Sequence, residues 1–149
     1  MNLPYSFRNV GPPISIVDLN SFEQELGCKL PESYRAFMLT TNGGYPANES
    51  YEVPGLPSFV LQLLYPLGGE KPFELRNMNI HGTELPSGLL RIGSSICGDP
   101  MALGIAGENY GKVYWQDHEQ AEDPEDWSSM NWMSDDFGEF MLSLKSLWS

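Results

Sequence analysis

The two histidines are the first residues to consider for chemistry, because imidazole is well suited to proton transfer near neutral pH. They are His81 and His118. His118 is the better candidate, since the carboxylates of Asp117, Glu119 and Glu122 lie within four positions of it. An imidazole beside carboxylates can act as a base or hold a metal ion, although catalytic zinc takes three protein ligands of defined geometry. The alternative is a solvated histidine at the end of a strand.

Two glycine-containing segments match catalytic or nucleotide-binding motifs only in part. The Gly-Ser-Ser segment at residues 93–95 lacks the second glycine of a G-x-S-x-G nucleophile elbow, so it is interpreted as a turn. The Gly-Gly pair at residues 68–69 lacks the Gly-Lys-Ser/Thr that completes a phosphate loop. The sequence therefore predicts no catalytic residue, no metal ion and no cofactor.

The net charge of the chain is strongly negative and unevenly distributed. The formal charge is −12, from 20 Asp and Glu against 8 Lys and Arg. Residues 113–144 contain nine acids and no Lys or Arg, so this segment alone carries −9. Phosphate binding needs clustered cations, which argues against nucleic acid as a direct partner. An electropositive protein partner fits the charge, and the alternative is an acidic surface that only maintains solubility.

Aromatic side chains accompany these acids, as they do at many protein interfaces. They are Tyr110, Tyr114, Trp115, Trp127 and Trp132. Because side chains alternate between the two faces of a strand, one set would pack in the core and the other would be available to a partner. We predict a partner-binding site formed by Tyr114, Asp117, His118, Glu119, Glu122, Asp123, Glu125, Asp126 and Trp127.

The length of 149 residues is sufficient for one domain that buries roughly 68 to 70 % of its unfolded surface. We expect a single domain over residues 1–149. Cys28 and Cys97 lack CxxC spacing and lie in apolar surroundings, so both are expected to be buried and reduced. No segment approaches the roughly 20 apolar residues of a membrane span, and residues 1–8 lack the pattern of a signal peptide. We expect a cytoplasmic protein without a membrane partner.

Two N-terminal helices are predicted to form a hairpin. Ser15 and Asp18 fit a capping box for the first helix, and Gly27 suits its end. The buried stripe of this helix would comprise Leu19, Phe22 and Leu26. Only four residues separate Leu26 from Pro31, so the connection to the second helix is short.

The second helix has explicit start and stop signals. Pro31 is expected at the first helical position, where its missing N–H costs nothing, with Glu32 at the positive end of the helix dipole. Asn42 and Gly43 tolerate the left-handed backbone that ends a helix, and Gly44 continues into a loop. The apolar face would comprise Tyr34, Phe37, Met38 and Thr41.

Strand-forming segments follow these helices. Residues 59–65 form an apolar run between two prolines, which predicts a strand covered on both faces. Residues 101–105 and 112–116 predict a β-hairpin around a glycine-containing loop. The other predicted pieces are an extended piece at residues 51–53 within a loop, a short helix within residues 72–81 and a strand at residues 89–93.

The last part of the chain predicts a surface excursion and a helix. Residues 117–131 would cross the surface, and Ser134 would then cap the helix with Asp135 and Asp136 near its positive end. The buried stripe would comprise Phe137, Phe140, Met141, Leu144 and Trp148. This order of elements predicts an α+β fold, with the N-terminal helix hairpin packed on a mainly antiparallel twisted sheet and a C-terminal helix.

One pattern of spaced residues extends through nearly the whole chain. It begins with Ile16, Phe22, Leu26, Gly27, Leu30, Pro31, Tyr34, Phe37, Asn42, Gly43 and Gly44. It continues with Ile92, Gly98, Asp99 and residues 101–105, 111–115 and 137–144. This pattern resembles the SUKH superfamily, the SMI/KNR-type domain.

The resemblance implies a binding protein and not an enzyme. Many members look like bacterial immunity proteins that bind and neutralise partner toxins, often nucleases, while fungal relatives regulate cell-wall synthesis. The matching residues would be architectural: Leu30, Pro31, Tyr34, Phe37, Asn42, Gly43, Gly44, Gly98 and Asp99. The toxin-contacting surface varies among relatives, so the acidic site is inferred from this chain alone.

The predicted function is therefore non-enzymatic neutralisation of a cognate bacterial toxin by direct binding. The partner would be a basic toxin domain, for example a nuclease, which an acidic surface attracts. Two alternatives stay open: a regulatory scaffold of the same family, and a small metal-dependent hydrolase that uses His118 with its neighbouring carboxylates.

Overall fold

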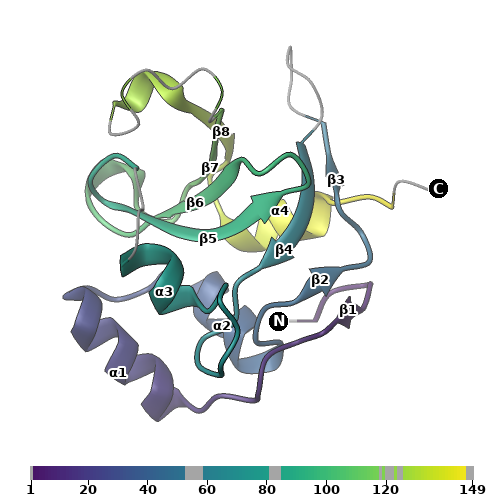
Figure 1. Cartoon of the computed structure of the whole chain (residues 1–149), viewed down its shortest axis with the longest axis vertical. Coiled ribbons are helices and arrows are strands. Elements are labelled where there is room, and N and C mark those ends of the chain that lie inside the picture. The colour runs from purple at the N-terminus through teal and green to yellow at the C-terminus, as the bar shows by residue number, and fades with distance from the viewer. Residues whose placement is uncertain are drawn as a thin grey trace.

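A curled antiparallel sheet forms the larger part of the structure, which is a computed structural model (Figure 1). It describes residues 2–52, 59–80, 85–117, 119, 123 and 126–146. The six strands lie in chain order: β3 (Ser50–Tyr51), β4 (Phe59–Leu64), β5 (Leu89–Ser95), β6 (Pro100–Gly104), β7 (Val113–Gln116) and β8 (Met130–Ser134). The predicted α+β fold is confirmed.

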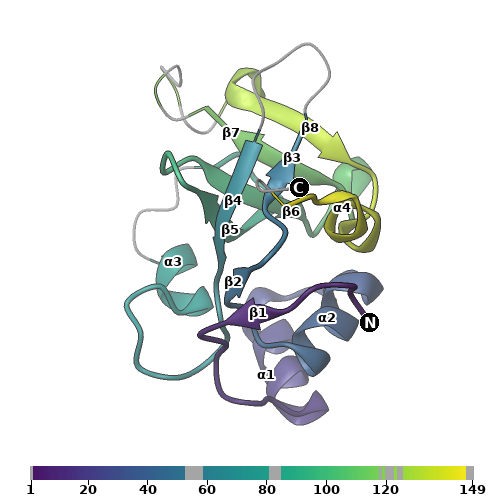
Figure 2. The ribbon, with the colours of Figure 1, turned by 90° about the vertical axis from the view of Figure 1, so that its right-hand side faces the viewer.

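The N-terminal helices lie at the end of the molecule opposite β7 and β8 (Figures 1 and 2). The described residues form the α-helices α1 (Ile16–Leu26), α2 (Glu32–Thr40), α3 (Leu75–Ile80) and α4 (Phe137–Ser143). A separate two-stranded sheet of β1 (Phe7–Arg8) and β2 (Tyr45–Pro46) lies near α2. Two short 3-10 helices, η1 (Gly107–Asn109) and η2 (Trp127–Ser129), lie in the loops on either side of β7.

Helix α1 has the predicted caps. The Ser15 hydroxyl accepts a hydrogen bond from the N–H of Asp18, and the Asp18 carboxylate accepts one from the N–H of Ser15. Gly27 ends the helix with φ at 78°, a left-handed conformation that glycine adopts without a Cβ clash. The sequence pattern is sufficient here because every partner in the cap lies within the helix and its ends.

A buried carboxylate joins α1 to α2. Oε1 of Glu23 lies 2.5 Å from Nη1 of Arg35, and Oε2 accepts a hydrogen bond of 2.7 Å from the N–H of Leu30.

Pro31 occupies the N-cap of α2, so the helix begins one residue later than predicted. The φ of −55° that its ring imposes is compatible with an extended residue just before a helix.

The prediction for Asn42 is wrong. Helix α2 ends at Thr40, and Asn42 is a buried connector that does not adopt the left-handed conformation. Its amide nitrogen donates to the carbonyls of Pro12 and Leu67, at 2.7 and 2.8 Å, and its oxygen accepts from the Leu67 N–H at 2.8 Å. Gly43 has a positive φ as predicted, and Gly44, which was expected only to continue into the loop, has one too.

The middle of the chain follows the predictions closely. Helix α3, strand β5 and the β6–β7 pair form where expected, and β5 extends two residues further, to Ser95. The extended piece predicted at residues 51–53 begins earlier, as β3, and residue 53 lies outside the described residues. Strand β4 is not covered on both faces throughout, since Gln62 is exposed.

Two corrections concern the end of the chain. The predicted excursion at residues 117–131 ends early, because Met130 begins strand β8, which pairs with β7. Ser134 belongs to that strand, and the N-cap of α4 is Asp136, whose carboxylate accepts a hydrogen bond of 3.0 Å from the N–H of Glu139. Phe137, Phe140, Met141 and Leu144 are buried as predicted, and Trp148 lies outside the described residues.

The sheet carries apolar clusters on both faces. The main cluster lies between the helices and the inner face and includes Leu19 of α1 and Phe140 of α4. A second, smaller cluster comprises Leu85, Leu89, Ala102 and Tyr114, with Met130 packed against it.

The expectation of two buried thiols is wrong, because Cys28 is half-buried and Cys97 is exposed. In the described part of the chain, no helix has the length and hydrophobicity to cross a membrane.

Candidate functional site

An aromatic pair joins β7 to η2 on the outer face of the sheet. Between these two elements lie residues 117–126, which we call the acidic segment. The rings of Tyr114 and Trp127 meet edge to face, with centroids 5.2 Å apart. Tyr114 is buried, and its hydroxyl donates a hydrogen bond of 2.7 Å to Oδ1 of Asn109. Trp127 is 39 % exposed, so Tyr114 supports a ring that still presents surface to solvent.

Hydrogen bonds attach both ends of the acidic segment to the sheet. The N–H of Asp117 donates to the carbonyl of Ser129 at 3.2 Å, and the side-chain amide of Gln116 donates to the Ser129 hydroxyl at 3.1 Å. Asp126 caps η2 by accepting from the N–H of Ser128 at 3.0 Å. Trp127 is therefore held by the turn on which it lies.

Three of the four acids that the structure describes between residues 117 and 126 are exposed. Glu119, Asp123 and Asp126 are exposed, and Asp117 is half-buried. Exposed carboxylates retain their hydration and act mainly through the long-range field that they create. His118, Glu122 and Glu125 were predicted for the same site and lie outside the described residues. Among the described side chains, no three of His, Cys, Asp and Glu gather as metal ligands would.

Trp132 and Asp135 extend this face beyond the predicted set. Trp132 is 50 % exposed and lies directly across from Tyr114 in the β7–β8 pair, so both side chains project from the same face. Its Nε1 donates a hydrogen bond of 3.0 Å to Oδ1 of Asp135. Burial, and secondly the negative charge of Asp135, raises the pKa of Tyr114. In the sequence, the only indication of this pair is that Trp132 precedes Asp135 by three positions. That spacing could not predict the contact without the position of strand β8.

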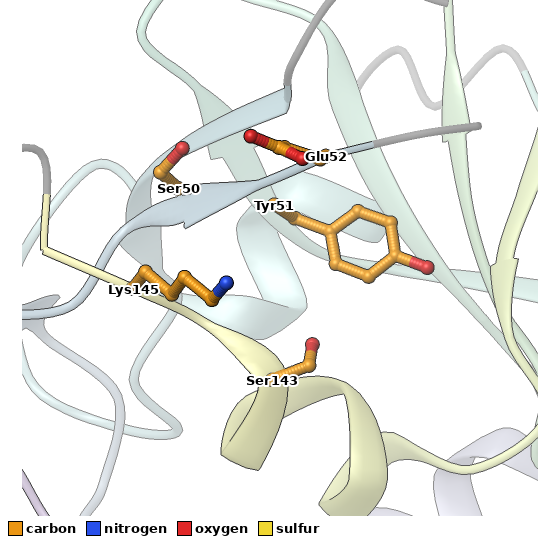
Figure 3. A pocket seen from close by; sticks show the side chains of 5 residues that line it. All are labelled: Ser50, Tyr51, Glu52, Ser143 and Lys145. Carbon is orange, nitrogen blue, oxygen red and sulfur yellow. The ribbon is translucent and has the colours of Figure 1, made fainter. Parts of the chain in front are cut away.

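The two edge strands of the sheet meet at a seam. The hydroxyl of Tyr51 in β3 donates a hydrogen bond to the carbonyl of Met133 in β8. The Tyr51 ring packs on the ring of Phe140, with the two ring centroids 5.1 Å apart. A hollow of about 270 Å³ lies on one side of Tyr51 and is lined by Ser50, Tyr51, Glu52, Ser143 and Lys145 (Figure 3).

A second hollow of about 310 Å³ shares the Tyr51 and Ser143 walls of the first. Its other lining residues include Trp132, Met133, Asp135 and Glu139. The two hollows adjoin at Tyr51 and Ser143, and together we call them the seam groove. It runs from Lys145 at one end to Trp132 at the other.

The residues predicted to be architectural hold the scaffold. Leu30, Tyr34 and Phe37 are buried in the main cluster. Between β5 and β6, the hydroxyl of Ser95 accepts hydrogen bonds of 3.1 Å from the N–H groups of Cys97 and Asp99. The interpretation of residues 93–95 as a turn is wrong, because they end strand β5, and Ser95 organises the turn that follows the strand.

The comparison with known families agrees with this architecture. Residues 13–143 match the SMI1 / KNR4 family (SUKH-1), and the chain belongs to that family. Membership is consistent with an immunity-type role based on protein binding. No curated protein matches the chain.

Proposed function

We propose that the protein is a cytoplasmic, single-domain immunity protein that neutralises a cognate bacterial toxin by binding it, without catalysis. Family membership supports the class of function. The observation that carries the choice of surface is Trp127, a partly exposed ring that packs on buried Tyr114 and directly follows the exposed Asp126.

This arrangement has the two components of a tight and selective interface. A preorganised aromatic side chain provides apolar contact area without a large entropy cost, and such residues carry much of the energy of known interfaces. The carboxylates of the acidic segment, including Glu119 and Asp123, would attract a basic partner and accelerate encounter. A nuclease toxin fits as the partner, because a surface that binds phosphates is itself basic.

The first experiment identifies the partner. We expect the adjacent reading frame to encode a large exported protein with a small basic C-terminal domain. Co-expression of that domain with the immunity protein should give a complex that co-purifies and suppresses toxicity. A toxin domain that stays active and unbound in the presence of this protein would contradict the proposal.

The second experiment separates attraction from anchoring in that complex. Reversing Glu119, Glu122 and Glu125 to Lys should lower the association rate by about tenfold or more at low salt and flatten its salt dependence. Trp127→Ala should instead accelerate dissociation and cost about 2 kcal/mol or more of affinity. Glu70→Lys, an exposed charge reversal outside this segment, is the matched control. An unchanged association rate in the triple variant would exclude the acidic segment as the interface.

A further inference from the structure

The Trp132 end of the seam groove lies at β8, the last strand in the sheet order, next to an exposed aromatic ring. In the described part of the chain, β8 has β7 as its neighbour in the sheet order and forms the end of that order. Across the seam, Tyr51 contributes one side-chain hydrogen bond to Met133 in place of a paired strand. The end of a sheet is a place where an extended chain can pass or add, although at β8 the Met133 carbonyl is already bonded to Tyr51.

Trp132 is held in place although half of it is exposed. Its indole N–H donates to Asp135 at 3.0 Å, so the orientation of the ring is fixed before any partner binds. A fixed ring loses little rotamer entropy on binding. The face of an indole also attracts cations more strongly than the ring of phenylalanine or tyrosine.

The charges differ between the two ends of the groove. Asp135 and Glu139 are exposed and line the hollow beside Trp132, and no Lys or Arg belongs to its described lining. At the other end, Lys145 and Glu52 lie around the first hollow, and Figure 3 shows the Tyr51 hydroxyl directed away from Lys145. A cation is therefore favoured at the Trp132 end, where two carboxylates line the hollow, more than at the other end, where the charges of Lys145 and Glu52 offset each other.

We propose that the hollow beside Trp132 receives an arginine or lysine side chain carried on an extended segment of the partner protein. Its cationic group would lie against the Trp132 ring and between the carboxylates of Asp135 and Glu139. The segment itself would follow the seam groove past Tyr51. This inference rests on the proposed function for the identity of the partner, and it adds a second contact region with a defined chemistry.

A short peptide tests this contact without the toxin. The probe is an acetylated, amidated pentapeptide with arginine at its centre and threonine or valine elsewhere. Its matched control has citrulline at the centre, which keeps the shape and removes the charge. The readout is the indole N–H resonance of Trp132 in a ¹H–¹⁵N NMR titration, assigned with the Trp132→Phe variant.

The arginine peptide should shift this resonance saturably, and the citrulline peptide should bind about fivefold more weakly or less. Asp135→Asn combined with Glu139→Gln should weaken the arginine peptide to a similar degree, since the introduced asparagine keeps an acceptor for the Trp132 indole and only the charges are lost. Glu70→Gln should leave binding unchanged. No saturable shift below about 10 mM, equal binding of both peptides, or an unaffected double variant would overturn the inference.

The outcome separates this inference from the proposed function. Where the toxin domain binds equally well to the wild type and to Asp135→Asn with Glu139→Gln, and the arginine peptide causes no shift, the seam groove is excluded as a contact region and the immunity role stays supported. If the arginine peptide binds saturably but the protein binds no toxin domain, the seam groove is supported as a binding site and the immunity role is excluded.

Discussion

Two tyrosines show how differently a hydroxyl can be used within one core. Tyr34 is buried in α2, and its hydroxyl has no hydrogen-bond partner among the described residues. Tyr51 donates its hydroxyl hydrogen to the carbonyl of Met133 and so joins β3 to β8. Burial raises the pKa of Tyr34, so its phenol stays neutral and its cost is that of an unsatisfied polar group.

Replacing each tyrosine with phenylalanine should therefore have opposite effects. Tyr34→Phe should leave the free energy of unfolding unchanged or raise it by about 1 kcal/mol, because it removes an unsatisfied buried group. Tyr51→Phe should lower it by about 1 kcal/mol, because the Met133 carbonyl loses its partner. Urea denaturation of the two variants measures both effects. A loss above about 1 kcal/mol in Tyr34→Phe would show that its hydroxyl is satisfied.

At the level of elements, the cap of α1 links stability to pH. Hydrogen bonds from the Ser15 backbone, then from its hydroxyl, lower the pKa of Asp18 in the folded state. The unfolded chain therefore binds the proton more readily than the folded one. The cap's contribution is complete above the unfolded pKa and is lost as the pH falls through the folded pKa.

Asp18→Asn isolates this contribution. The wild type should be the more stable of the two near pH 6, and the difference in unfolding free energy should shrink between about pH 5 and pH 2. In a Ser15→Ala background, the effect of Asp18→Asn should depend less on pH, since one of the hydrogen bonds that lowers the pKa is gone. A difference that stays constant over this range would contradict the cap as the cause.

The elements that could be predicted from sequence are those whose signals are local. The capping box at Ser15 and the β6–β7 pair were found because all their partners lie close in sequence. Strand β8 was missed because Met130 and Trp132 follow an acidic run, and their strand character comes from pairing with β7. Ser134 and Asp136 are both good capping residues, and only the end of β8 decides between them.

Contacts between distant segments could not be predicted from sequence. The bond from Tyr51 to Met133 spans 82 positions, and the bonds of Asn42 reach Pro12 and Leu67 over 30 and 25 positions. For the candidate site, composition indicated the acidic segment, while the contribution of Trp132 required the register of β7 and β8. Local patterns determine elements, and the packing of distant segments determines which of them meet.

For the whole molecule, the uneven charge should lower the free energy of unfolding, besides its proposed use in recognition. Nine acids without a cation in residues 113–144 repel one another in the folded state, and salt screens this repulsion. Raising NaCl from about 0.02 to 0.3 M should increase the free energy of unfolding by on the order of 1 kcal/mol. Reversing Glu119, Glu122 and Glu125 to Lys should reduce that increment, whereas Glu70→Lys should change it less, because Glu70 lies outside the segment. Urea denaturation at several salt concentrations measures it, and equal increments in all three proteins would mean that the acids are too well solvated to repel.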